Sequence, residues 1–585
     1  MAGGGGGPQK TDDFQPHPIK DQLPGVDFCV TSSPPWPEAI LLGFQHFLVM
    51  LGTTVFIPTL LVPLMGGGNV EKAKVIETIL FVAGINTLLQ TWFGTRLPVV
   101  MGASYAFIIP VVSIALSRRF DVYIDPHRRF KETMKAVQGA IVIASLLQVI
   151  FGFLGFVRIF GRYLSPLSAV PLVTLTGLGF FAFGFPQLAK CVEIGLPALI
   201  LVVFISQYTM RLKPPIFGRF AVLFTVAIVW TYAEILTAAG AYKKRSYATQ
   251  ISCRTDRSGL ISAAPWIRIP YPFQWGRPDF NAGDIFAMMA AAFVAIIEGV
   301  STFLDGIFGS VSGSTASVEN AGLLGMTRVG SRRVIQISAA FMLFFSVLGK
   351  FGAFLASIPM PIFAALYCVL FAYVASAGLG LLQFCNLNSF RTMFIVGFSI
   401  FMGLSVTEYF HEYHLISDRG PVHTRSIWFN NIVEVIFSSP ATVGIIVALF
   451  LDLTVSRGHS TTRRDSGVKW YPSHRAAGVN SVFLVPSVYY DAEQIKPFGN
   501  EALATKEKGR GRGMKTFVSV AMDRRRSETV SFDSENNNDE ELERGRSDLS
   551  DRKIWIPGFR DSDSNWETIM IRPGAWARWL MSCKG

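Results

Sequence analysis

Twelve apolar stretches follow one another between residues 38 and 455, and they constrain the fold more than any other feature. Each is close to the roughly 20 residues that a helix needs to cross the hydrocarbon of a membrane. Backbone polar groups in lipid must be satisfied inside the segment, which favours helices. We therefore predict an all-α, polytopic membrane protein. The stretches are 38–62, 74–93, 97–116, 135–157, 164–185, 194–210, 217–240, 283–304, 334–358, 361–382, 390–406 and 437–455.

Composition supports this class of protein. The mean hydropathy is +0.39 and only 16% of residues are charged, against about 25% in soluble chains. The net charge of +12 is typical of basic loops and tails on a membrane protein rather than of a nucleic-acid partner. The basic clusters do not alternate between the two faces, so some spans are half-length or some basic loops are external. The six cysteines lie far apart, and their spacing predicts neither a disulfide framework nor a metal site.

Two polar segments flank the apolar part. Residues 1–37 are rich in Gly and Pro and are expected to form a disordered arm without a signal peptide. Residues 456–585 carry mixed charges and no apolar window long enough to cross a membrane. We expect this tail to be mostly disordered and cytosolic, with both termini cytoplasmic.

The segment 309–328 is unusual for a membrane helix because it is rich in Gly and Ser and carries Glu319 beside Asn320. A second carboxylate, Glu298, lies in the apolar run before it. A buried carboxylate costs a few kcal/mol in lipid, so such residues usually face a cavity and mark a transport pathway. Irregular backbone at membrane depth is tolerated only where protein or a cavity satisfies it.

The third stretch has the same irregular character. Small residues around Ser104 stand between Pro98 and Pro110, which predicts a span broken near its middle or, equally, a helix-packing face. A half-helix that starts inside the bilayer offers free N–H groups and a positive dipole end, and Tyr105 could stack on a planar ligand. Gln45 and His46 are neighbours in the first span, so they point in different directions. One of them can face the cavity while the other hydrogen-bonds a neighbouring helix.

Two interrupted spans in corresponding halves indicate an inverted-repeat transporter with its site at the membrane midplane. Ionised carboxylates only accept hydrogen bonds, so Glu298 and Glu319 suit a neutral substrate with several N–H donors. Buried carboxyl groups also suit proton coupling. The chain lacks a P-loop and any catalytic pattern around the two acids, so we predict a secondary transporter without cofactors or metal, and no enzyme.

Several of these residues match one family pattern. Glu319-Asn320-Ala-Gly322-Leu-Leu-Gly-Met-Thr327-Arg328, followed by Val329-Gly-Ser-Arg-Arg-Val-Ile-Gln336, resembles the signature of the nucleobase–ascorbate transporters. Gln45-His46 and Ser104-Tyr105-Ala106 fit the same family, and the segments 253–257 and 386–391 resemble its plant branch. The resemblance covers roughly residues 36–470.

The resemblance implies a seven-plus-seven inverted repeat of 12–14 segments, one or two of them incomplete. It implies a core domain (38–157 and 283–358), a gate domain (164–240 and 361–455) and a homodimer in the plasma membrane. The implied activity is proton-coupled symport of xanthine, uric acid or uracil; a vertebrate branch carries ascorbate with sodium.

The resemblance also implies roles for individual residues. Glu298 and Glu319 would contact the base, Tyr105 would stack on its ring, and the backbone near Ala106 and Val318 would meet its carbonyl oxygens. The remaining residues would shape or support the site: Ser104, Asn320, Thr327, Gln45, His46, Gly322 and Arg328.

The chain departs from the family pattern after Phe303. There it passes directly into Leu304-Asp-Gly-Ile-Phe-Gly309, so on the order of 25–30 residues are absent, whereas one crossing needs about 20. The joined piece either dips into the membrane and returns, or crosses it and inverts everything downstream. In addition, Thr302 stands where many members have an acid, and the tail after residue 470 is unlike the family.

Two alternatives to a nucleobase carrier remain open. An anion carrier of the same fold would favour a positive or neutral half-helix junction, which two acids oppose. A transport-inactive member shortened after Phe303 would keep the fold without the activity.

Overall fold

The computed structural model describes residues 27–28, 30, 32–154, 164–209, 216–256, 259–294, 298–417 and 420–455. The chain divides into two compact units, 1–498 and 499–585, and every described residue lies in the first. Most of the expected N-terminal arm and the whole tail from residue 456 lie outside the described residues.

Most of the described residues are helical, as predicted. Among the described residues, seven helices are long and apolar enough to cross a membrane. An eighth is added if α16 (Arg332–Val347) and α17 (Gly349–Leu355), bent by 114° where they meet, are one span. Each of the twelve apolar stretches coincides with one or more helices. The sequence analysis did not anticipate α20 (Ile427–Phe437), which precedes the last stretch.

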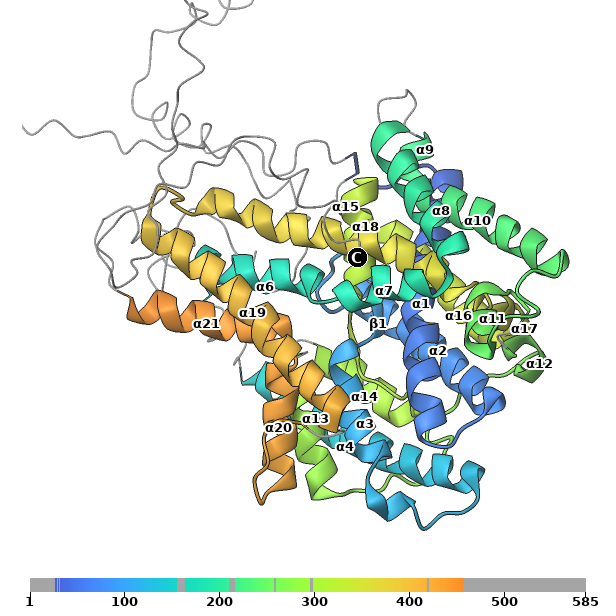
Figure 1. Ribbon diagram of the computed structural model, residues 1–585, viewed down its shortest axis with the longest axis horizontal. Helices are drawn as coiled ribbons and strands as arrows, with labels where there is room; N and C mark the ends of the chain where they lie inside the picture. The colour runs from blue at the N-terminus through green and yellow to red at the C-terminus, as the bar shows by residue number, and fades with distance from the viewer. Residues whose placement is uncertain are drawn as a thin grey trace, which may run out of the picture. The chain divides into compact units, whose positions relative to one another are not determined.

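One group of helices packs around α2 and α4 (Figure 1). Helices α1 and α16 lie against α2, while α13 and α14 lie against α4. The bounds are α1 Trp36–Leu64, α2 Asn69–Trp92, α4 Pro126–Phe153, α13 Ala282–Val294, α14 Gly299–Phe308 and α16 Arg332–Val347.

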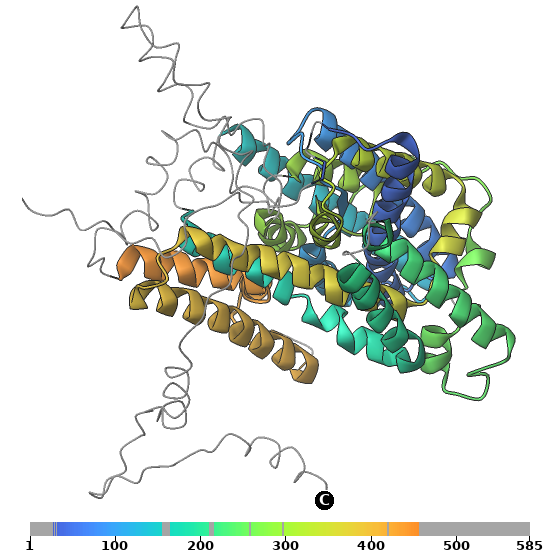
Figure 2. The same ribbon diagram turned by 90° about the horizontal axis from the view of Figure 1, so that it is seen from above.

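A second group packs around α6 and α18, seen from above in Figure 2. Helices α19 and α21 pack against α6, and α8 lies between α18 and α10. The bounds are α6 Pro166–Leu178, α8 Val192–Val203, α10 Ala221–Ala238, α18 Met360–Gly380, α19 Phe390–Ser417 and α21 Pro440–Thr454. The assignment of the two groups as core and gate domains stays a prediction.

Short elements connect these helices. They are η1 Tyr105–Phe107, α3 Ile108–Ala115, η2 Arg118–Phe120, η3 Phe181–Phe183, α7 Phe185–Leu188, η4 Ala189–Cys191, a π-helical turn Phe204–Tyr208, α9 Ile216–Arg219, α11 Tyr247–Cys253, α12 Leu260–Ala263, α15 Val318–Thr327, α17 Gly349–Leu355 and η8 Leu381–Phe384.

Two short strands meet where the sequence predicted interrupted spans. Strand β1 (Met101–Ala103) pairs antiparallel with β2 (Ser314–Ala316), with Gly102 opposite Thr315. Each strand is followed by a half-length helix, η1 and α3 after β1 and α15 after β2. The two halves of the chain thus contribute matching interrupted spans that run in opposite directions, as an inverted repeat requires.

Helices α13 and α14 form a hairpin against α4. Near the start of the hairpin, the Asp279 N–H donates to the Lys135 carbonyl at 3.0 Å. Further along, the Gln148 side chain donates to the Ala292 carbonyl at 2.7 Å. On the way back, the Gln138 side chain donates to the Ile307 carbonyl at 3.0 Å.

The hairpin therefore enters alongside α4 and returns to the level at which it began. This geometry decides between the two alternatives for the shortened segment: the piece dips in and comes back rather than crossing.

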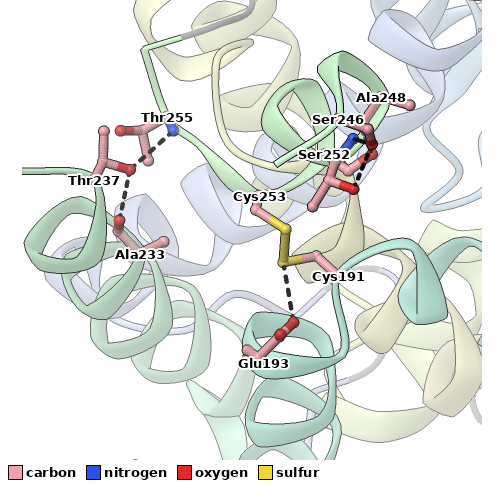
Figure 3. The surroundings of a disulfide bond; sticks show 10 residues. Cys191, Glu193, Ala233, Thr237, Ser246, Ala248, Ser252, Cys253 and Thr255 are labelled. Carbon is pink, nitrogen blue, oxygen red and sulfur yellow. Dashed lines mark hydrogen bonds between the residues drawn. A yellow bond between two sulfur atoms is a disulfide. The ribbon is translucent and has the colours of Figure 1, made fainter. Parts of the chain in front are cut away.

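The second helix group contains a disulfide, which the spacing of the cysteines did not predict. Cys191, at the start of α8, is bonded to Cys253 at the end of α11, 62 residues later (Figure 3). The bond fastens the long segment after α10 to the second helix group. Nearby, the Thr255 N–H donates to the Thr237 hydroxyl of α10 at 3.3 Å, and the Asp256 carboxylate raises the pKa of Arg254 through a hydrogen bond.

The aromatic residues of the segment 241–282 do not all behave as an interfacial belt. Trp266 and Tyr271 are exposed, as expected of one. Trp275 is buried, its ring packs edge-on against Phe130, and its indole N–H donates to the Gly309 carbonyl at 2.9 Å. Trp275 therefore holds the end of the hairpin against α4.

Candidate functional site

The site is built where two half-helices begin beside the paired strands. Ser104 caps the first, its hydroxyl accepting the Ala106 N–H at 3.3 Å. Ser317 caps the second, accepting the Asn320 N–H at 3.3 Å. The first N–H groups of a helix have no partner within it and carry a partial positive charge. Ala106 and Val318 lie in these first turns, and the Ala106 N–H is the one that Ser104 accepts.

Glu319 lies in the first turn of α15 and is buried. Its carboxylate accepts a hydrogen bond from the Thr53 hydroxyl of α1. The Thr53 oxygen is also 3.2 Å from the Tyr367 hydroxyl of α18 and accepts from the Tyr105 hydroxyl at 3.5 Å. Thr53 therefore joins the Glu319 carboxylate of α15 to two tyrosine hydroxyls, one from η1 and one from α18.

Asn320 is fixed from two sides. Its amide nitrogen donates to the Ser317 hydroxyl at 2.8 Å, which leaves its oxygen facing His46 Nδ1, also at 2.8 Å. That oxygen can only accept, so His46 Nδ1 carries the proton. Asn320 and His46 are both buried, and together they join α15 to α1. Asn320 therefore positions the first turn of α15, beside Glu319.

Glu298 lies at the start of α14 and is half-buried. Its carboxylate accepts a long hydrogen bond, 3.4 Å, from the Ala316 N–H of β2. Ala316 precedes Glu319 by three residues, so the structure brings the first acid to the strand that leads into the second. The short hairpin thus places Glu298 beside β2, at the break in the second interrupted span, although residues are missing from the hairpin.

Aromatic side chains line the neighbouring space. The Tyr105 ring centroid is 4.7 Å from those of both Phe180 and Phe183, which belong to the connection after α6. Phe180 also packs against Phe371 of α18, at 5.3 Å. Tyr105 thus lies between the two helix groups, and its stacking on a substrate ring stays a prediction.

The remaining predicted residues have structural partners. The Gln45 side chain donates to the Arg219 carbonyl at 3.2 Å, so Gln45 and His46 contact different neighbours. Thr327 is buried and donates to the Leu323 carbonyl of its own helix at 2.9 Å. Arg328 ends α15 with a positive φ of 59°.

Gly322 is required by a close approach of two helices. A Cβ atom at this position would lie 2.2 Å from the carbonyl oxygen of Leu370 in α18. The glycine of the signature therefore lets α15 lie directly against the backbone of α18.

Three further residues belong to the site although the sequence did not predict them. Thr53 lies two helical turns after His46 and on the same face of α1, which is a usable signal. Tyr367 shares its apolar stretch with two other hydroxyl side chains, Tyr373 and Ser376, and nothing in the sequence distinguishes it from them. Asp305 in α14 is buried and accepts from the hydroxyls of Ser310, at 2.9 Å, and Ser314. This third acid anchors the hairpin to β2.

The model of a permease family matches residues 37–300 and 297–412. Nucleobase-ascorbate transporter 4 of Arabidopsis thaliana is 65% identical over 498 positions, covering 80% of this chain and 95% of the relative. The chain belongs to the nucleobase–ascorbate transporter family.

Two further similarities were found. Nucleobase-ascorbate transporter 6 of Arabidopsis thaliana, a second member of the family, is 58% identical over 81% of this chain and 96% of its own length. A solved structure, described as the overall structure of SLC26A9, aligns over 71% of this chain and 64% of that chain, with a TM-score of 0.40 and 14% identity.

The family alignments also agree with the proposed loss of residues. The match to the permease family breaks and restarts within residues 297–300, at the junction of α13 and α14. The loss therefore lies a few residues before Phe303, and the position predicted for it was wrong. The 498 aligned positions exceed the 80% of this 585-residue chain that they cover, so the relative carries residues without a counterpart here.

Proposed function

We propose that this protein is a secondary active transporter that carries a nucleobase, such as xanthine, uric acid or uracil, together with a proton. The observation that carries the proposal is the buried Glu319, at the start of a half-helix, with Glu298 bonded to the strand before it. The ring N–H groups of a base would donate to these carboxylates. Its carbonyl oxygens would accept from the first N–H groups of the half-helices, near Ala106 and Val318.

Proton coupling follows from the same two acids. A carboxylate taken out of water is stabilised by binding a proton, and a bound base completes its hydrogen bonds. Loading of substrate and proton at one place gives symport. The relatives, which are named nucleobase–ascorbate transporters, support this class of substrate.

The cellular setting is part of the proposal. Disulfides persist in oxidising surroundings, so the end of the molecule with Cys191–Cys253 would face the cell exterior. Glu38, at the start of α1, forms an ion pair with Arg219, and α10 runs from beside Arg219 towards the disulfide. The N-terminus would then be cytoplasmic, in the plasma membrane, in a homodimer like those expected of the family.

The test is uptake of radiolabelled xanthine and uracil by yeast that lacks its own transporters. Glu298→Gln keeps the size of the side chain and removes its charge, and it should abolish uptake while surface expression is unchanged. The matched control, Glu193→Gln, makes the same chemical change at an exposed position and should retain uptake. Unchanged uptake in the first variant would remove Glu298 from the site.

The shortened hairpin favours a second candidate, a folded member of the family that does not transport. A family-like segment inserted where the family match breaks, within residues 297–300, separates the two. If only the lengthened chain takes up the bases, the short form is inactive. If both forms take them up equally, the hairpin suffices for transport.

A further inference from the structure

A basic pocket lies at one end of the first helix group, away from the site just described. It has a volume of about 360 Å³ and is lined by Val30, Ser33, Thr91, Trp92, Arg96, Arg332, Arg333 and Gln336. Three of these residues are arginines and none is acidic. Among the described residues, no ion pair is formed by any of the three.

Two features of the backbone are unfavourable at this pocket, the first through charge and the second through conformation. Arg332 and Arg333 occupy the first turn of α16, which contains no acidic residue, and cations are unfavourable at the positive end of a helix. Arg96 has a φ of +56°, a left-handed conformation that is uncommon outside glycine. An anion in the pocket would compensate all three charges at once.

The surroundings indicate where such an anion comes from. Trp92 lines the pocket and is 50% exposed, next to Phe93, which is 74% exposed. The Arg333 guanidinium lies 4.9 Å from the ring centroid of Trp36, which is 61% exposed. Exposed aromatic rings beside arginines are typical of the headgroup level of a membrane.

The pocket and the disulfide lie at opposite ends of α2. Helix α2 begins at Asn69, which lies against Gly259, shortly after the disulfide-bonded Cys253. It ends at Trp92, which lines the pocket. If the disulfide faces the oxidising exterior, the pocket faces the cytoplasmic leaflet, which holds the anionic lipids.

We propose that this pocket binds the phosphate group of an anionic phospholipid in the cytoplasmic leaflet. The guanidinium groups of Arg96, Arg332 and Arg333 would donate to the phosphate oxygens, which arginine matches in geometry. The exposed rings of Trp92 and Trp36 would lie against the glycerol and upper acyl region. The inference does not depend on what the protein transports.

The test measures lipid binding by the purified full-length chain. Native mass spectrometry in detergent would count retained phosphatidylserine against phosphatidylcholine, and a thermal melt with inorganic phosphate would test the free ion. The triple variant R96Q/R332Q/R333Q should bind phosphatidylserine about a hundredfold more weakly, since each basic side chain near an anionic surface contributes about fivefold. The matched control removes three charges at the opposite end, by K243Q/K244Q/R245Q, and should bind as the unchanged protein does.

Each other outcome overturns the proposal. Equal retention of the two lipids, or equal binding by the triple variant and its control, would exclude a phospholipid site. Protection by inorganic phosphate without preference for phosphatidylserine would make the pocket a site for free phosphate instead. If the triple variant fails to fold, the single variants R332Q and R333Q must each lose about fivefold; no loss in either would refute the site.

Discussion

Thr53→Val tests the centre of the site because it removes one hydroxyl and almost no volume. That hydroxyl donates to the buried carboxylate of Glu319, and its oxygen lies within hydrogen-bond distance of Tyr105 and Tyr367. Hydrogen bonds to charged groups contribute about 1.5–3 kcal/mol, and a buried acceptor left without its donor costs a similar amount. We therefore expect a loss of about 2–3 kcal/mol in stability.

The neighbouring residue provides the control. Thr54 is equally buried, but its hydroxyl donates to the Met50 carbonyl of its own helix at 3.0 Å. That carbonyl already accepts a helical hydrogen bond, so Thr54→Val should cost no more than about 1 kcal/mol. The assay is the apparent Tm of the purified protein in detergent, together with the KM for uptake in yeast.

The Thr53 variant should lose several times more in Tm than the Thr54 variant, and its KM should rise because Glu319 is no longer held in place. Equal Tm and equal KM in the two variants would refute the reasoning. It would mean that the contact between α1 and α15 does not organise the carboxylate.

Three further predictions concern the same scaffold. Gly322→Ala should prevent correct packing and abolish surface expression, because the new methyl group would overlap a carbonyl oxygen of α18; Gly325→Ala on the same helix, with ordinary contacts at 3.6 Å, should be expressed normally. Cys191→Ser should lower the Tm by the equivalent of about 2–4 kcal/mol, and Cys253→Ser should add nothing to it; additive losses would show that the two sulfurs are not bonded. Asn320→Ala should raise the KM for uptake more than it lowers expression, and a loss confined to expression would count against a role in the site.

The positions of the long helices, though not that of α20, could be predicted from hydropathy because lipid imposes both the length and the composition of a span. The two interrupted spans were also predictable, since Gly and Pro lower the stability of a continuous helix and here they gather with Ser inside apolar stretches. These local signals located β1, β2 and the half-helices that follow them.

The partners of the polar residues could not be predicted in the same way. Thr53 and Glu319 are 266 residues apart, and His46 and Asn320 are 274 apart, so only the packing of α1 against α15 brings them together. The disulfide escaped for a similar reason, because spacing in sequence does not show that Cys191 and Cys253 lie 5.5 Å apart between their Cα atoms. The return of the α13–α14 hairpin depends on its contacts with α4, which no local pattern reports.

That return has a consequence for how such a chain can change in evolution. Removing the second half of one membrane segment and the first half of the next leaves the parity of crossings intact, so every later segment still enters the bilayer from its customary side. A shortened product of this kind can be inserted by the same machinery and assembled around the same strand pair. Paired half-segments are therefore the natural unit that a multispanning carrier can lose without being turned inside out.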